Sequence, residues 1–139
     1  MAYYYKKHWT PDTCKRYADH IFIFGDNDES CGKGGQAVIR DEPNAMGIPT
    51  KKRPNNHPSS FYTDDEYYTN IQHINRAIAK IKKRLINYNG LMYPIDGIGT
   101  GLAQLNIKAP KTFIYLNKRL RNLFRYAKSI KRVLYNADE

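Results

Sequence analysis

Ile21-Phe22-Ile23-Phe24-Gly25-Asp26-Asn27 decides the fold, together with the glycine cluster Gly32-Lys33-Gly34-Gly35-Gln36 that follows it. The apolar run predicts a buried strand, and the glycines predict a tight loop leading into a helix over residues 36–41. Glycines let a backbone approach a ligand closely, and the first N–H groups of a helix attract an anion. The unit therefore predicts an anion-binding loop, with phosphate as the expected ligand. The alternative is an ordinary turn in which the glycines serve only the chain reversal.

A second loop of the same kind follows another apolar run. Residues 91–93 predict a strand, Gly97-Ile98-Gly99-Thr100-Gly101-Leu102 carries three more glycines, and a helical pattern begins near Pro110. Loops at the carboxyl ends of strands gather at one edge of an open α/β sheet, where ligands bind. We expect the two loops to hold one diphosphate between them. The alternative is that these glycines, too, only shape a tight connection.

Helical and extended patterns alternate along the rest of the chain. Three further helices are predicted: one over residues 10–18, one that starts at the capping-box spacing Thr63-Asp64-Asp65-Glu66 and ends at Asn89-Gly90, and one that starts near residue 110. Extended segments are predicted over residues 45–50 and 130–135, and a polar loop over residues 51–61. This alternation indicates one α/β domain over residues 1–139. We expect three layers, with a mostly parallel or mixed central sheet and helices on both faces.

The charge of the 139 residues favours encounters with polyanions. Lys and Arg number 23 against 13 Asp and Glu, a formal net charge of +10 at pH 7, and such an excess attracts nucleic acid. The alternative is that the cations of the two long predicted helices only form a solvated surface. No apolar run reaches the roughly 18 residues of a membrane span, and the first residues lack the apolar core of a secretory signal. We therefore expect a cytoplasmic protein without a membrane partner.

Neither the cysteines nor the histidines indicate a cofactor. Cys14 and Cys31 are too few to define a disulfide framework, so both are expected to be free thiols. His57 and His73 have no second His or Cys at the spacing of a metal site. We expect no metal and no cofactor, and the oligomeric state stays open.

The two glycine loops resemble those of macro domains, small α/β modules that bind ADP-ribose. In macro domains an Asn at the end of a core strand precedes a run of glycines, as Asn27 precedes Gly32, Gly34 and Gly35 here. A second macro loop holds the diphosphate, and residues 99–102 are similar to it. The resemblance implies a three-layer α/β fold and an ADP-ribose site built from both loops.

Within that superfamily, the sequence looks most like the terminal ADP-ribose protein glycohydrolase branch. Residues 48–53, Ile-Pro-Thr-Lys-Lys-Arg, and 98–105, Ile-Gly-Thr-Gly-Leu-Ala-Gln-Leu, match two segments of that branch. The resemblance implies that Lys51 is the nucleophile or ribose-engaging amine. It departs from the branch at Ala103, which stands where the branch has an Asp that helps to turn over the adduct. Residues 24–27, Phe-Gly-Asp-Asn, and 32–37, Gly-Lys-Gly-Gly-Gln-Ala, also resemble segments of small bacteriophage proteins.

The resemblance, which covers about residues 20 to 120, implies a full set of site residues. The expected ligand-binding residues are Asp26, Asn27, Gly32, Lys33, Gly34, Gly35, Gln36, Thr50, Gly97, Ile98, Gly99, Thr100, Gly101 and Leu102. The expected catalytic residues are Lys51 and Asp96. Asp96 enters because Ala103 lacks a carboxylate and a neighbouring acid is needed, and Asp26 is a second candidate for that task.

Three residues of the first loop have a structural alternative. Asn27 suits a ribose hydroxyl, but it also suits an Asx-turn that closes the loop. Lys33 suits a phosphate, but an exposed loop lysine is as good an explanation. Arg40, at the end of the predicted helix, is expected at the surface as a partner of the helix dipole.

Three functions compete on these grounds. The first is ADP-ribose binding, with hydrolysis of ADP-ribosyl groups from a macromolecule such as nucleic acid. The second is a non-catalytic, basic nucleic-acid-binding protein on the same fold. The third is another nucleotide enzyme that acts on a free nucleotide.

Overall fold

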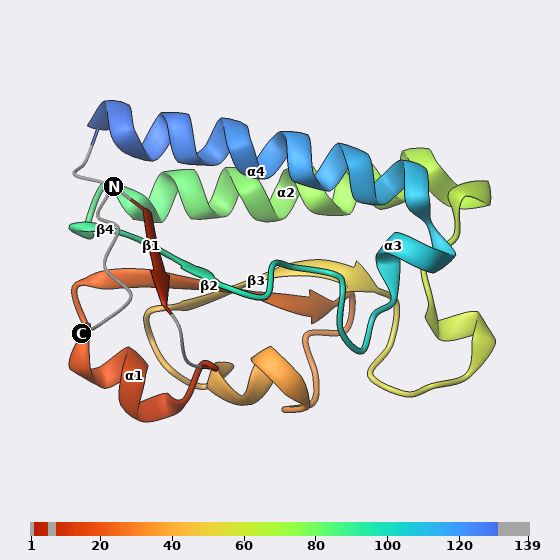
Figure 1. Cartoon of the computed structure of the whole chain (residues 1–139), viewed down its shortest axis with the longest axis horizontal. Coiled ribbons are helices and arrows are strands. Elements are labelled where there is room, and N and C mark those ends of the chain that lie inside the picture. Colours follow the sequence, from red (N-terminus) through yellow and green to blue (C-terminus); the bar gives the residue numbers. More distant parts are fainter. Residues whose placement is uncertain (1, 6–7, 131–139) are drawn as a thin grey trace.

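The computed structural model describes residues 2–5 and 8–130, which form a parallel sheet covered by helices on both faces (Figure 1). The sheet has four strands in the order β1-β4-β2-β3, and each neighbouring pair is parallel. The strands are β1 (Ala2–Tyr5), β2 (His20–Asn27), β3 (Ala45–Lys51) and β4 (Gly90–Pro94). The prediction of an α/β fold is confirmed. Strands β2, β3 and β4 contain three of the four segments predicted as extended, whereas β1 was not predicted.

Strand β2 shows why the sheet carries helices on both faces. Its side chains alternate, because successive residues of a strand point to opposite sides. Ile21 and Ile23 pack in one core cluster with the long helices α2 (Tyr67–Leu85) and α4 (Pro110–Ile130). Phe22 and Phe24 pack in a second cluster on the other face. Since both faces are covered, the strand reads as a continuous apolar run.

The second cluster is covered by two short helices, α1 (Pro11–Arg16) and the 3₁₀ helix η1 (Gly35–Ile39). The prediction of a helix over residues 36–41 is wrong in type and length, because η1 is a single 3₁₀ segment of five residues. Pro43 follows closely and disfavours a helical conformation in the residue before it. The first loop therefore has no α-helix dipole that would attract an anion, and only the N–H groups of the loop can do so.

The capping-box prediction is also corrected. Thr63 makes no side-chain cap bond, a 3₁₀ turn occupies Asp64–Glu66, and α2 begins only at Tyr67. Asp64 instead caps the other long helix: its carboxylate accepts hydrogen bonds from the backbone N–H groups of Lys111 (2.8 Å) and Thr112 (3.0 Å). Burial opposes the charged form, but these hydrogen bonds prevail and lower the pKa of Asp64. One carboxylate thus ties the start of α4 to the segment before α2.

The described chain ends within the last predicted element. Ile130 is the final residue of α4, so that residue of the strand predicted over 130–135 is helical, and the others lie outside the described residues. No helix of the described part is long and apolar enough to cross a membrane.

Candidate functional site

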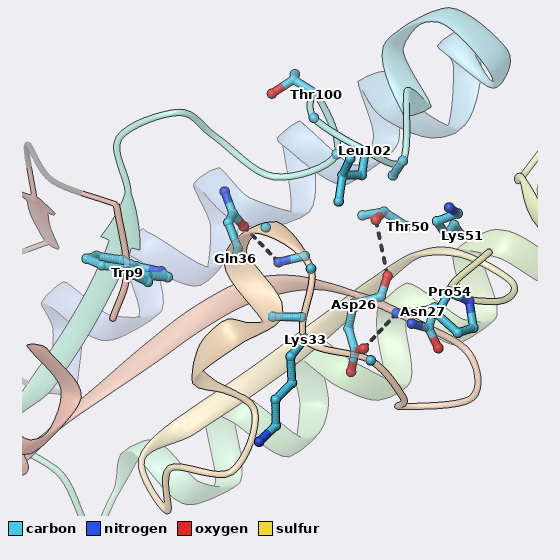
Figure 2. A pocket seen from close by; sticks show the side chains of 18 of the residues that line it. Trp9, Asp26, Asn27, Lys33, Gln36, Thr50, Lys51, Pro54, Thr100 and Leu102 are labelled. Carbon is cyan, nitrogen blue, oxygen red and sulfur yellow. Dashed lines mark hydrogen bonds between the residues drawn. The ribbon is translucent and has the colours of Figure 1, made fainter. Parts of the chain in front are cut away.

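A pocket of about 790 Å³ lies where β2 and β3 end and where the loop after β4 comes down on them (Figure 2). Its volume is within the range of about 300–1,000 Å³ that small-molecule sites occupy. The two glycine loops form opposite parts of its wall, as expected at the carboxyl edge of a parallel sheet.

Fourteen of the sixteen predicted site residues line this pocket. They are Asp26, Asn27, Gly32, Lys33, Gly34, Gly35, Gln36, Thr50, Lys51, Asp96, Gly99, Thr100, Gly101 and Leu102. The other two do not line it. Ile98 is 1% exposed and belongs to the core beside the long helices, and Gly97 turns its carbonyl toward Gln36.

The backbone N–H groups of both loops are free. Within the described chain, the N–H groups of residues 32–36 and 100–103 donate no hydrogen bond. Gly32 has φ +87° and Gly35 φ +58°, conformations that side chains with a Cβ rarely adopt and that glycine allows. Unpaired N–H groups of consecutive residues in a turn form a concave anion site.

Gln36 holds the two loops in register. Its side-chain oxygen accepts a hydrogen bond from the N–H of Gly25 at 2.9 Å, and its side-chain nitrogen donates one to the carbonyl of Gly97 at 2.7 Å. Leu102 of the second loop also lies against Gly34 of the first. A Cβ atom added to Gly34 would be only 3.3 Å from Cδ1 of Leu102, which shows how close the two loops are. Gln36 was predicted as a ligand contact, and the structure gives it a bridging position.

The side chain of Asn27 closes the first loop. Its Oδ1 accepts from the N–H groups of Glu29 (3.1 Å) and Cys31 (3.4 Å), and its Nδ2 donates to the carbonyl of Cys31 at 2.7 Å. These contacts are the Asx-turn alternative. The amide group of Asn27 is thus occupied in this structure, although the residue still lines the pocket.

Arg40 and Asp26 form a buried ion pair beneath the first loop. Arg40 Nη2 lies 2.5 Å from Asp26 Oδ1 and Nη1 lies 3.0 Å from Oδ2, and the two side chains are 15% and 9% exposed. Arg40 also donates to the carbonyls of Gly32 and Cys31. The expectation of a surface role for Arg40 is therefore wrong, because the residue ties the glycine loop to the end of β2. Asp26 has both carboxylate oxygens engaged, which leaves it poorly placed for acid–base work.

Lys33 does not direct its amine toward the second loop. The side chain extends away from Thr100 and Leu102 (Figure 2), and its ammonium forms an exposed ion pair with Asp41. Lys33 therefore has the position of an exposed loop lysine, which was the alternative to phosphate binding.

Lys51 is a buried lysine at the end of β3. Only 7% of the residue is exposed, its Nζ donates to the carbonyl of Asn55 at 2.8 Å, and Nζ lies 4.5 Å from the ring centroid of Phe61. No carboxylate of the described residues forms an ion pair with it. Burial lowers the pKa of Lys51 below its ordinary value of 10.5. The neutral amine needed for nucleophilic chemistry is therefore more accessible here than at the surface.

The remaining acid–base candidates lie on the second loop. Asp96 is exposed, and its Oδ2 is 3.2 Å from Nδ1 of His8. Ala103 lines the same pocket and is 8% exposed, so the position that lacks the expected carboxylate does belong to the wall. Of the two carboxylates at the pocket, Asp96 is the one that stays open to solvent.

Several wall residues were not among the predicted site residues, including His8, Trp9 and Pro54. Trp9 is 3% exposed, donates from Nε1 to the carbonyl of Ile23 at 3.0 Å and meets Phe22 edge to face. An apolar residue just before a helix cap is expected to pack against that helix. No spacing in the sequence indicates that Trp9 also lies beside loops far along the chain. Topology alone brings it to the pocket.

No metal centre accompanies the pocket in the part of the chain that the structure describes: nowhere in it do three or more His, Cys, Asp or Glu side chains gather as a metal would need. Cys14 is buried and Cys31 is exposed, and both are free thiols. Burial raises the pKa of the Cys14 thiol to about 12, which makes it unreactive at neutral pH.

Comparison with known proteins gives a family without a known activity. No curated protein and no solved structure matches the chain significantly. One family model matches residues 4–119, which include both glycine loops and Lys51. The chain therefore belongs to the family of unknown function DUF7831.

Proposed function

We propose that the pocket binds ADP-ribose or a related nucleoside diphosphate. The observation that carries this proposal is the set of unpaired backbone N–H groups in two facing loops around one cavity. Backbone N–H groups that point at a common space are a usual solution for phosphate recognition. Two such loops suit a ligand with two phosphates, and the resemblance to macro domains makes ADP-ribose the first candidate.

The rest of the pocket suits the sugar and base of such a ligand. Leu102 and Trp9 supply apolar surface, and the Lys51 amine supplies a positive charge or, when neutral, a nucleophile. Ligand pockets of this size combine such apolar walls with a few fixed polar groups.

Isothermal titration of the purified protein with ADP-ribose tests the proposal, with ADP and AMP as comparison ligands. We expect micromolar affinity, about −8 kcal/mol, and weaker binding of AMP, which has a single phosphate. Gly101→Val should weaken ADP-ribose binding at least tenfold, because its side chain would enter the open space at the wall. A Cβ at Gly101 has no heavy atom of the protein within 4 Å, so the melting temperature should not change. A folded protein that gives no heat with ADP-ribose contradicts the proposal.

Hydrolysis of ADP-ribosyl groups is a second candidate function, favoured by the lowered pKa of Lys51. The neutral Nζ would attack C1 of the distal ribose, and the C1 bond to the carrier would break with its electron pair leaving on the carrier. Water would then replace the lysine nitrogen. Asp96 is the carboxylate available for the proton transfers, because Ala103 has none and Asp26 is held by Arg40.

Release of ADP-ribose from an ADP-ribosylated protein or DNA tests this activity. We expect Lys51→Met to abolish release. When the ribose ring of the lysine adduct opens, C1 and Nζ form an imine, and borohydride reduction of the imine should leave a stable adduct on the wild-type protein that mass spectrometry places at Lys51. Release that persists in Lys51→Met overturns this mechanism.

A further inference from the structure

The positive charge of the protein is concentrated in one layer. Helices α2 and α4 carry eleven of the 23 Lys and Arg residues and none of the 13 Asp and Glu residues. The remainder of the chain has twelve basic and thirteen acidic residues and is close to neutral. The formal net charge of +10 is therefore a property of the two long helices.

Of the eight described Lys and Arg residues outside α2 and α4, five are paired with a carboxylate, whereas none of the eleven on these two helices is paired with a carboxylate of the described residues. Among the described residues, the ion pairs that join Lys or Arg to a carboxylate all lie outside α2 and α4, namely Lys15–Glu42, Lys33–Asp41, Arg40–Asp26, Lys52–Glu66 and Arg53–Glu29. Seven exposed cations on the helices have neither an ion pair nor a hydrogen bond within the described residues. They are Arg76, Lys80, Lys83, Lys118, Arg121, Arg125 and Lys128.

We call these seven cations the basic layer, and they lie on two neighbouring helices. The helices α2 and α4 lie side by side over the same face of the sheet (Figure 1). Asn75 Oδ1 joins them by accepting from Tyr115 Oη at 2.9 Å and Arg119 Nε at 3.0 Å. Helices of 19 and 21 residues extend about 30 Å at 1.5 Å per residue. A track of this length suits an extended polyanion better than a small anion.

An exposed aromatic residue lies at one end of this layer. Tyr68, in the first turn of α2, is 73% exposed. Its ring lies 5.4 Å from that of Tyr67 and 5.9 Å from the amine of Lys111, at the start of α4. An exposed ring beside a cation is a stacking platform of the kind that single-stranded nucleic acids use. The helices begin at the end of the molecule where β2 and β3 finish (Figure 1).

The chemistry of the helices disfavours a lipid partner. A helix that binds a bilayer surface inserts an apolar face into it. The apolar faces of α2 and α4, including Ile74, Ile78, Leu116 and Leu120, are buried in the core against the sheet. The exposed side chains of the two helices are mostly charged, with Tyr68 and single apolar residues such as Ile114, which is 70% exposed.

We propose that the basic layer, with Tyr68 at its end, binds the phosphodiester backbone of single-stranded nucleic acid. The cations contact phosphates and release counterions, and Tyr68 stacks on a base. This surface goes beyond the proposed function of the pocket and does not depend on it.

Fluorescence anisotropy with labelled 20-nucleotide dT and rU strands tests the proposal, with a 20-base-pair duplex and anionic phosphatidylserine vesicles as comparisons. We expect binding of both single strands, with the dT and rU arms showing whether DNA or RNA is preferred. The double variant Lys83→Gln and Arg125→Gln should bind about tenfold more weakly and lower the slope of log K against log salt by about 1.4. Glutamine is a good helix former, so the helices should persist.

The matched control is Lys15→Gln with Arg16→Gln, which removes the same charges from α1. It should bind within about twofold of the wild type. Tyr68→Ala should weaken binding of the single strands about tenfold while leaving the salt slope unchanged, because stacking carries no charge. In all these variants ADP-ribose binding should stay as in the wild type, which separates this proposal from that for the pocket.

Three results would overturn the proposal. The first is absence of binding to either strand by the folded protein. The second is an equal loss in the α1 control, which would make the effect one of net charge alone. The third is a preference for the duplex or for vesicles together with no effect of Tyr68→Ala.

Discussion

The pocket and the basic layer differ in the chemical groups that are proposed to bind phosphate. In the pocket the donors are backbone N–H groups in loops fixed by Gln36, Asn27 and Arg40. In the layer they are seven charges at the ends of long side chains that form no ion pair with another described residue. Fixed dipoles act at hydrogen-bond distance, whereas free charges act over roughly a Debye length, about 10 Å at 0.1 M salt. The two proposed phosphate-binding surfaces should therefore respond differently to salt, mutation and pH.

Salt should produce the largest contrast. If a single strand covers four of the seven cations, raising salt from 50 to 200 mM should weaken its binding about fifty-fold, because each neutralised phosphate contributes about 0.7 to the salt slope. ADP-ribose binding should change by no more than about threefold over the same range. Titrations of both ligands in one buffer series measure this. Equal salt slopes for the two ligands would contradict the proposed difference between the pocket and the basic layer.

Gln36→Leu should break the pocket and spare the layer. It removes the bridge between the N–H of Gly25 and the carbonyl of Gly97 and leaves these two partly buried groups without this side-chain partner. Each such group costs about 1 kcal/mol or more, so we expect a loss of about 2 kcal/mol in the free energy of unfolding and weaker ADP-ribose binding. Urea unfolding and titration measure the two effects. Nucleic-acid affinity should not change, and a parallel loss there would show that the two surfaces are coupled.

The sequence predicts the pocket better than it predicts the contacts that build it. The strands and both glycine loops follow from local signals, since an apolar run and a glycine cluster are visible within a few residues. The Gln36 bridge joins residues 61 positions apart, and Asp64 caps a helix 47 positions away. Such pairings depend on how the elements pack, and no local pattern contains them.

The same limit explains the wrong expectations for single residues. Arg40 was placed at the surface as a partner of the dipole of the predicted helix, yet the fold pairs it with Asp26. Ile98 was grouped with the glycines around it, yet the loop turns its side chain into the core. For the two long helices, the sequence did predict which face is buried in the core, because their apolar residues repeat every three to four positions.

The smallest expected effect concerns Lys51, the one pocket cation that the structure buries. Its pKa is lowered by burial, so between that lowered pKa and the ordinary 10.5 the unfolded chain binds more protons at this position than the folded one. The stability of the wild type should therefore rise with pH through this window relative to Lys51→Met, which lacks the titrating group. Urea unfolding at pH 7, 9 and 10.5 measures the difference, which should be smaller than the Gln36→Leu effect.

A matched lysine on the basic layer gives the control for this prediction. Lys118 is exposed, so the difference between the wild type and Lys118→Met should stay nearly constant over the same pH range. The other lysines and the tyrosines titrate alike in each pair and cancel. A flat difference for Lys51→Met, or one that falls as pH rises, would mean that the amine is hydrated in solution. The buried, partly neutral nucleophile would then be lost as a basis for hydrolysis, while ADP-ribose binding through the backbone N–H groups would stand unaffected.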